Sequence, residues 1–99
     1  MPSAVIYKYV NIRLCVSNHV HVLKWNALIF RASAYRQLQS LELAQEDIDR
    51  AMARAPNHPD GLLERGIIRR LKGDAAGAQA DWQRAIEVAP GSPAADAAR

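Results

Sequence analysis

Three side chains near the beginning of the chain have the chemistry of a nucleophile or of metal ligands: Cys15, His19 and His21. A histidine beside a cysteine can take its proton and leave a reactive thiolate. Residues 1–40 contain no Asp or Glu, so no nearby acid could orient either imidazole. We therefore expect no catalytic Cys–His pair here, and we expect the chain not to be an enzyme.

The same histidines are poor evidence for a metal site. His19 and His21 would lie on one side of a strand, but a structural zinc site takes four ligands, and His58 lies far along the chain. No glycine-rich loop that could hold a phosphate is present, and Gly73-Asp74 is typical of a turn. We expect no metal and no cofactor.

The composition is that of one small globular domain. The chain has 99 residues, of which 49% are hydrophobic and 23% charged. Its single cysteine, Cys15, excludes an internal disulfide. No apolar run reaches the roughly 18 residues of a membrane span, and Lys8 and Arg13 interrupt the only stretch that resembles a signal peptide. These features predict a soluble, cytoplasmic protein that does not associate with a membrane.

Charge is unevenly distributed along the chain. Residues 1–40 carry five basic and no acidic side chains, a charge of +5, whereas residues 41–99 carry eight basic and ten acidic ones, a charge of −2. The excess could attract nucleic acid, or the beginning of the chain could simply be poor in acids. Because two or three phosphate contacts give only weak binding at physiological salt, nucleic acid is not the expected partner.

A repeat of 34 residues is the strongest pattern in the sequence. Small and polar residues recur at this offset, among them Ala44 and Ala78, Ala51 and Ala85, Ala55 and Ala89, Pro56 and Pro90, Arg31 and Arg65, Arg36 and Arg70, Asp47 and Asp81. A fixed period of this length is typical of helical repeat proteins.

Each unit of the repeat predicts two helices. Pro59 suits a first helical position, Gly73 can adopt positive φ in a turn, and Asp74 can cap the helix that follows. Pro90-Gly91 ends that helix, and Ser92-Pro93 can begin another. The predicted helices cover residues 25–38, 41–54, 59–71 and 75–88.

On these residues the chain resembles the tetratricopeptide repeat (TPR) family. The family's pattern of small, large apolar and proline positions matches Leu28, Ala32, Tyr35, Ala44, Ile48, Ala51 and Pro56, and then Leu62, Gly66, Ala78, Trp82, Ala85 and Pro90. The resemblance implies an all-α fold, an antiparallel array of helix hairpins that forms a fragment of an α-solenoid. It implies one repeat at 25–58 and a second at 59–92.

Two departures from the family pattern predict ion pairs. Arg31 and Arg65 stand where the family has leucine, and Asp47 and Asp81 lie opposite them in an antiparallel hairpin. We expect the pairs Arg31–Asp47 and Arg65–Asp81, unless each arginine lies along the surface with only its stem packed.

The two ends of the chain depart from the repeat. Residues 1–24 do not continue it, and their β-branched and aromatic residues favour a strand by local propensity. A strand would have no partner sheet, so we expect a helix docked on the first repeat, with an irregular lead-in as the alternative. Residues 93–99 are typical of the start of a capping helix.

The resemblance implies that the first helices of the two repeats line a concave groove. Its predicted apolar anchors are Ile29, Phe30, Leu63 and Ile67, with Arg36 and Arg70 steering an acidic group of the ligand. The groove lacks the Lys and Asn residues of the family's carboxylate clamp. We expect a protein or peptide partner. Alternatively, a second copy of the chain or residues 1–24 cover the groove.

Overall fold

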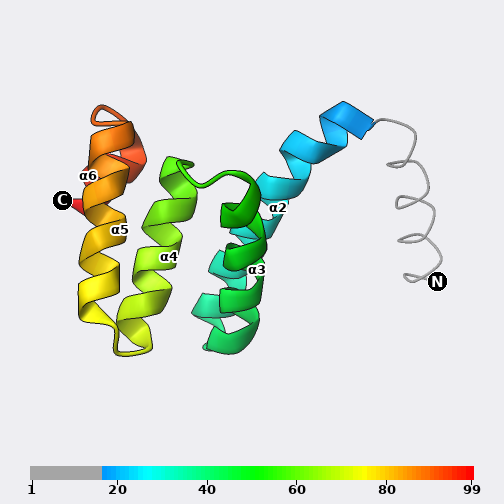
Figure 1. Cartoon of the computed structure of the whole chain (residues 1–99). Helices are drawn as coiled ribbons and strands as arrows, with labels where there is room; N and C mark the ends of the chain where they lie inside the picture. The colour runs from blue at the N-terminus through cyan, green and yellow to red at the C-terminus, as the bar shows by residue number, and fades with distance from the viewer. Residues whose placement is uncertain (1–16) are drawn as a thin grey trace.

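The computed structural model describes the backbone of residues 17–99 and the side chains of residues 25–99. This part of the chain is all-helical (Figure 1). Its helices are α2 (Ser17–Gln37), α3 (Leu41–Arg54), α4 (Pro59–Leu71), α5 (Ala75–Val88) and α6 (Pro93–Ala98). None of them is long and apolar enough to cross a membrane.

The predicted helix bounds hold for most of the chain. Helices α3, α4 and α5 cover the predicted residues, and α6 begins at Pro93 as expected. The prediction for the first helix is wrong at its beginning, because α2 starts at Ser17 rather than near Trp25. Residues 17–24 thus extend the first helix of the array and do not form a separate docked one. Residues 1–16, for which we expected strand propensity or a docked helix, lie outside the described part.

Neighbouring helices form two antiparallel hairpins that lie side by side. Helices α2 and α3 form the first hairpin and α4 and α5 the second (Figure 1). Helix α4 packs on α3 and α2, and α6 in turn packs on α5 and α4. Helix α6 buries Ala94 and Ala95 in that contact. The core runs through both hairpins, with Ile48, Leu62 and Ile68 as its largest fully buried side chains.

Small residues allow the helices of each hairpin to approach closely. Ala32 and Ala44 are fully buried between α2 and α3, and Ala78 is buried in the second hairpin. A Cβ atom on Gly66 would lie 2.6 Å from Cδ1 of Trp82, so glycine makes room for the indole. The Nε1–H of Trp82 donates to the carbonyl oxygen of Leu63 at 3.3 Å. Trp82 therefore packs within its own hairpin.

Both predicted arginine–aspartate pairs are confirmed. Arg31 donates to the two carboxylate oxygens of Asp47 at 2.6 and 2.8 Å. Arg65 donates to Asp81 at 3.0 and 2.8 Å. Both aspartates are buried, with 3% and 4% of their surface exposed. Hydrogen bonding to the buried carboxylate raises the pKa of both guanidinium groups above its usual value, so neither arginine loses its proton in the range where proteins are stable.

The two hairpins differ in what surrounds this pair. In the first, the guanidinium carbon of Arg31 lies 5.7 Å from the centre of the Tyr35 ring. In the second, Arg69 occupies the position equivalent to Tyr35 and donates to Asp81 at 3.0 Å. Asp81 is thus held by two arginines, and Asp47 by one among the described residues.

The turns of the two hairpins also have equivalent residues in the same conformation. Gly73 has a φ of 93°, and Gln39, which is 34 residues earlier, has a φ of 63°. The side chain of Asp74 accepts from the backbone N–H of Gly77 at 2.9 Å, whereas Ser40 makes no side-chain cap. The first turn therefore uses residues less suited to its shape than those of the second.

Replacing Gln39 by glycine is expected to stabilise the chain. A left-handed conformation costs a side-chain-bearing residue about 1–2 kcal/mol, more than glycine loses through its freer unfolded state. We expect Gln39→Gly to raise the free energy of unfolding in urea by about 0.5 kcal/mol. The matched control Gln79→Gly, at an exposed position inside α5, should lower it by about 0.5–1 kcal/mol. A loss of stability in Gln39→Gly would contradict this account of the turn.

Removing the arginine of each pair should have unequal effects. Arg31→Met leaves buried Asp47 without a cation, and we expect a loss of about 2 kcal/mol of unfolding free energy. Arg65→Met leaves Asp81 bonded to Arg69, so about half that loss is expected. Urea unfolding of both variants measures the difference. Equal losses would mean that Arg69 gives Asp81 no compensation.

Candidate functional site

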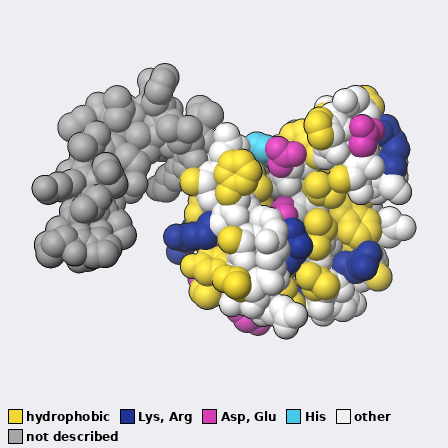
Figure 2. Space-filling model, turned by 180° about the vertical axis from the view of Figure 1, so that it is seen from behind, with side chains coloured by type: hydrophobic (Ala, Val, Ile, Leu, Met, Phe, Trp, Pro, Cys, Tyr) yellow, Lys and Arg dark blue, Asp and Glu magenta, His cyan; other side chains and the backbone are white. Residues whose placement is uncertain are grey.

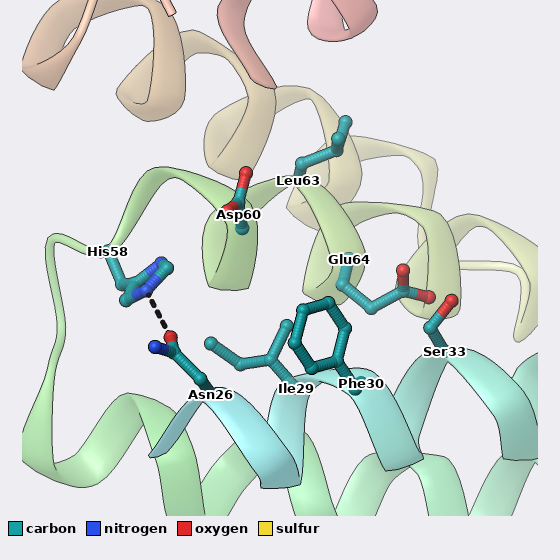
Figure 3. Close-up of a pocket in the computed structure, with 8 residues that line it drawn as sticks. All are labelled: Asn26, Ile29, Phe30, Ser33, His58, Asp60, Leu63 and Glu64. Carbon is teal, nitrogen blue, oxygen red and sulfur yellow. Dashed lines mark hydrogen bonds between the residues drawn. The ribbon is translucent and has the colours of Figure 1, made fainter. Parts of the chain in front are cut away.

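A pocket of about 200 Å³ opens between the first helices of the two hairpins. Figure 3 shows its walls, which come from α2, from α4 and from the residue just before α4. Its lining residues are Asn26, Ile29, Phe30, Ser33, His58, Asp60, Leu63 and Glu64. Three of these eight, Ile29, Phe30 and Leu63, are predicted apolar anchors of the concave groove.

The apolar part of the pocket comes from three predicted anchors. Ile29 is buried, with 6% of its surface exposed, and forms the floor together with the base of Phe30 (Figure 3). Phe30 leaves 74% of its surface in solvent. Leu63 is half-buried on α4, across from both. These side chains offer hydrophobic surface from two helices to one ligand group.

His58 closes one end of the pocket. Its Nδ1 accepts from the backbone N–H of Gly61 at 3.4 Å and so caps α4. Its Nε2 lies 3.0 Å from the side-chain oxygen of Asn26 on α2. Because Nδ1 accepts a hydrogen bond, the proton of the neutral ring is on Nε2, which donates to Asn26. One imidazole thus links the first turn of α4 to α2.

Glu64 and Arg36 form an ion pair beside the pocket. Arg36 donates through Nε to one carboxylate oxygen of Glu64 and through Nη2 to the other at 3.3 Å. Nη2 also lies 3.2 Å from the Ser33 hydroxyl. Glu64 is 7% exposed, so the pair compensates an otherwise buried charge. Arg36, which was expected to steer an acidic ligand, is thus paired with Glu64, and its role towards a ligand stays a prediction.

The other predicted site residues lie farther along α4. Ile67 is half-buried and Arg70 is exposed, and neither lines the pocket. Arg70 makes no ion pair with any side chain in residues 25–99. The structure thus brings together Ile29, Phe30 and Leu63 in the pocket and leaves Ile67 and Arg70 outside it.

From the sequence, His58 was mentioned only as a histidine too far along the chain to complete a metal site. Its place immediately before Pro59, a first-turn proline, is the signal that could have marked it as a helix cap. Over residues 25–99 no group of three His, Cys, Asp or Glu side chains could hold a metal ion. Cys15 and the side chains of His19 and His21 lie outside the described part, so their predicted lack of catalytic function stays a prediction.

Figure 2 shows this face of the molecule. Hydrophobic side chains line both sides of a hollow, a histidine and an acidic side chain meet at one end of it, and basic side chains lie towards the other. Comparison of the chain with family models, with curated proteins and with solved structures finds no match. The residues that line the pocket are therefore the basis for its function.

Substitutions at His58 test its role in joining the hairpins. His58→Ala removes the cap of α4 and the bond to Asn26, and we expect a loss of about 1 kcal/mol of unfolding free energy. His58→Asn keeps a capping oxygen and should recover about half of that. Asn26→Ala should cost less in the His58→Ala background than alone. Full additivity of the two alanine changes in urea unfolding would show that the residues are not coupled.

Proposed function

We propose that this chain is a TPR-like, non-catalytic interaction module that binds an apolar segment of a partner protein between α2 and α4. The arrangement of the helices supports the repeat assignment. Two helix hairpins follow each other, and both place an arginine–aspartate pair at the same separation of 16 residues. We also propose a cytoplasmic setting, which suits a chain with one cysteine.

The pocket beside Phe30 is the observation that carries the binding function. Single exposed apolar residues are common on protein surfaces and need no explanation. Phe30, however, is 74% exposed at the edge of a pocket of about 200 Å³ whose other walls include Ile29 and Leu63. An apolar cavity of about 150 Å³ can hold a benzene ring. The pocket can therefore take one aromatic or branched apolar side chain.

The shape of the site favours a helical or extended peptide over an isolated small molecule. Pockets for small ligands are commonly about 300–1,000 Å³ and bury most of the ligand. The present one is smaller, and half-buried Ile67 and exposed Arg70 follow its lining residues along α4. A partner segment could place one anchor in the pocket and run along this surface, as amphipathic helices do in apolar grooves.

Selection of binding peptides tests the proposal. Displayed random 12-residue peptides would be selected on the full chain, and their dissociation constants measured by fluorescence anisotropy. We expect Phe30→Ala and Leu63→Ala each to weaken the selected peptides by about tenfold, which is the usual effect of removing an anchor at the centre of an interface. Leu38→Ala is the control, because Leu38 is 73% exposed and lies outside the pocket.

Two results would contradict the proposal. Peptides whose affinity is unchanged by Phe30→Ala and Leu63→Ala bind elsewhere. A chain that light scattering shows to be dimeric, and that becomes monomeric in Phe30→Ala, uses this surface between copies. That second result would establish the alternative function, self-association of a short repeat array.

A further inference from the structure

The two carboxylates that line the pocket have different surroundings. Glu64 is 7% exposed, and Arg36 donates to both of its oxygens. Its charge is therefore matched within the protein. Asp60 is exposed on the first turn of α4, and it has no ion-pair partner among residues 25–99. Asp60 is the carboxylate that remains available to a ligand.

Among the side chains of residues 25–99, no Lys or Arg lines the pocket beside Asp60. Both ring nitrogens of the neighbouring His58 already have partners, the backbone N–H of Gly61 at Nδ1 and the side-chain oxygen of Asn26 at Nε2. Arg70, the open basic residue of the groove, follows Asp60 by ten residues on the same helix, which places it about 15 Å away along the axis. That distance exceeds the Debye length of about 8 Å at physiological salt. The pocket end of the groove is thus negative.

From this charge arrangement we infer that the group bound in the pocket is an aromatic or branched apolar side chain with a cation beside it. In a peptide partner this means a Lys or Arg adjacent to the anchor. The inference rests on the proposed function and reverses the acidic ligand expected from the sequence. Two features of the site serve a cation: the carboxylate of Asp60, and the exposed face of the Phe30 ring, which attracts positive charge.

Small aromatic probes that differ only in charge test the inference directly. Phenethylammonium, 2-phenylethanol and 3-phenylpropionate carry the same phenyl ring on a two-carbon linker, with charges of plus one, zero and minus one. Each would be titrated into the full chain, and binding followed through the backbone amide shifts of residues 58–64 in NMR spectra. We expect phenethylammonium to bind about threefold more tightly than 2-phenylethanol, as one exposed ion pair allows, and 3-phenylpropionate to bind more weakly than either.

Matched variants assign the charge preference to Asp60. In Asp60→Asn, phenethylammonium and 2-phenylethanol should bind equally. Glu46→Gln removes the same charge from an exposed position on α3, outside the pocket, and should leave the threefold preference intact. Raising the salt concentration should reduce the preference in the unaltered chain and have no such effect in Asp60→Asn.

The possible failures are distinguishable. If no probe shifts residues 58–64, the pocket does not take an aromatic group, and the proposed function fails with the inference. If 2-phenylethanol binds and phenethylammonium is no tighter, the pocket stands and the inference alone is overturned. A preference for 3-phenylpropionate that Arg70→Gln removes would restore the acidic ligand. Binding that weakens as the chain concentration rises would identify a second copy as the occupant.

Discussion

The burial of one carboxylate in each hairpin is the constraint on which the rest of the structure depends. Asp47 and Asp81 are almost fully buried, which is costly for a charged group unless it is paired and hydrogen-bonded. Each hairpin meets the constraint with an arginine from its first helix that reaches the aspartate of its second. Pairing at this point fixes the register of the two helices. The small residues Ala32 and Gly66 then let the helices close upon each other.

The sequence predicts contacts within a hairpin better than contacts between hairpins. The 34-residue period aligns equivalent residues, so helix bounds and the Arg31–Asp47 and Arg65–Asp81 pairs follow from it. The pair between Arg36 and Glu64 joins different units and has no repeated counterpart in the sequence. Its formation depends on how far one hairpin is rotated against the next, which periodicity does not specify. The early start of α2 escaped prediction for a related reason, because residues 17–24 lack the repeat that guided the other bounds.

The same limit explains which features of the site were predicted from the sequence and which were not. The resemblance to the TPR family implied a groove along the first helices, and its positions included Ile29, Phe30 and Leu63, which line the pocket. The sign of the charge beside these three residues could not be predicted from the sequence. It depends on which carboxylate each arginine reaches, and Arg36 turns to Glu64 while Asp60 is left to solvent. The expectation of an acidic ligand came from counting basic residues in the groove. That count did not include the pairing of Arg36 with Glu64.

The pocket also has mechanical significance, since its walls belong to separate hairpins. Ile29 and Phe30 belong to the first hairpin, and Asp60 and Leu63 belong to the second. Any change in the angle between the hairpins alters the width of the space between these walls. If the proposed partner side chain binds there, it favours one angle between the two hairpins, and by linkage a change in that angle alters the affinity for the side chain. The proposed binding in the pocket and the angle between the two hairpins are thus coupled.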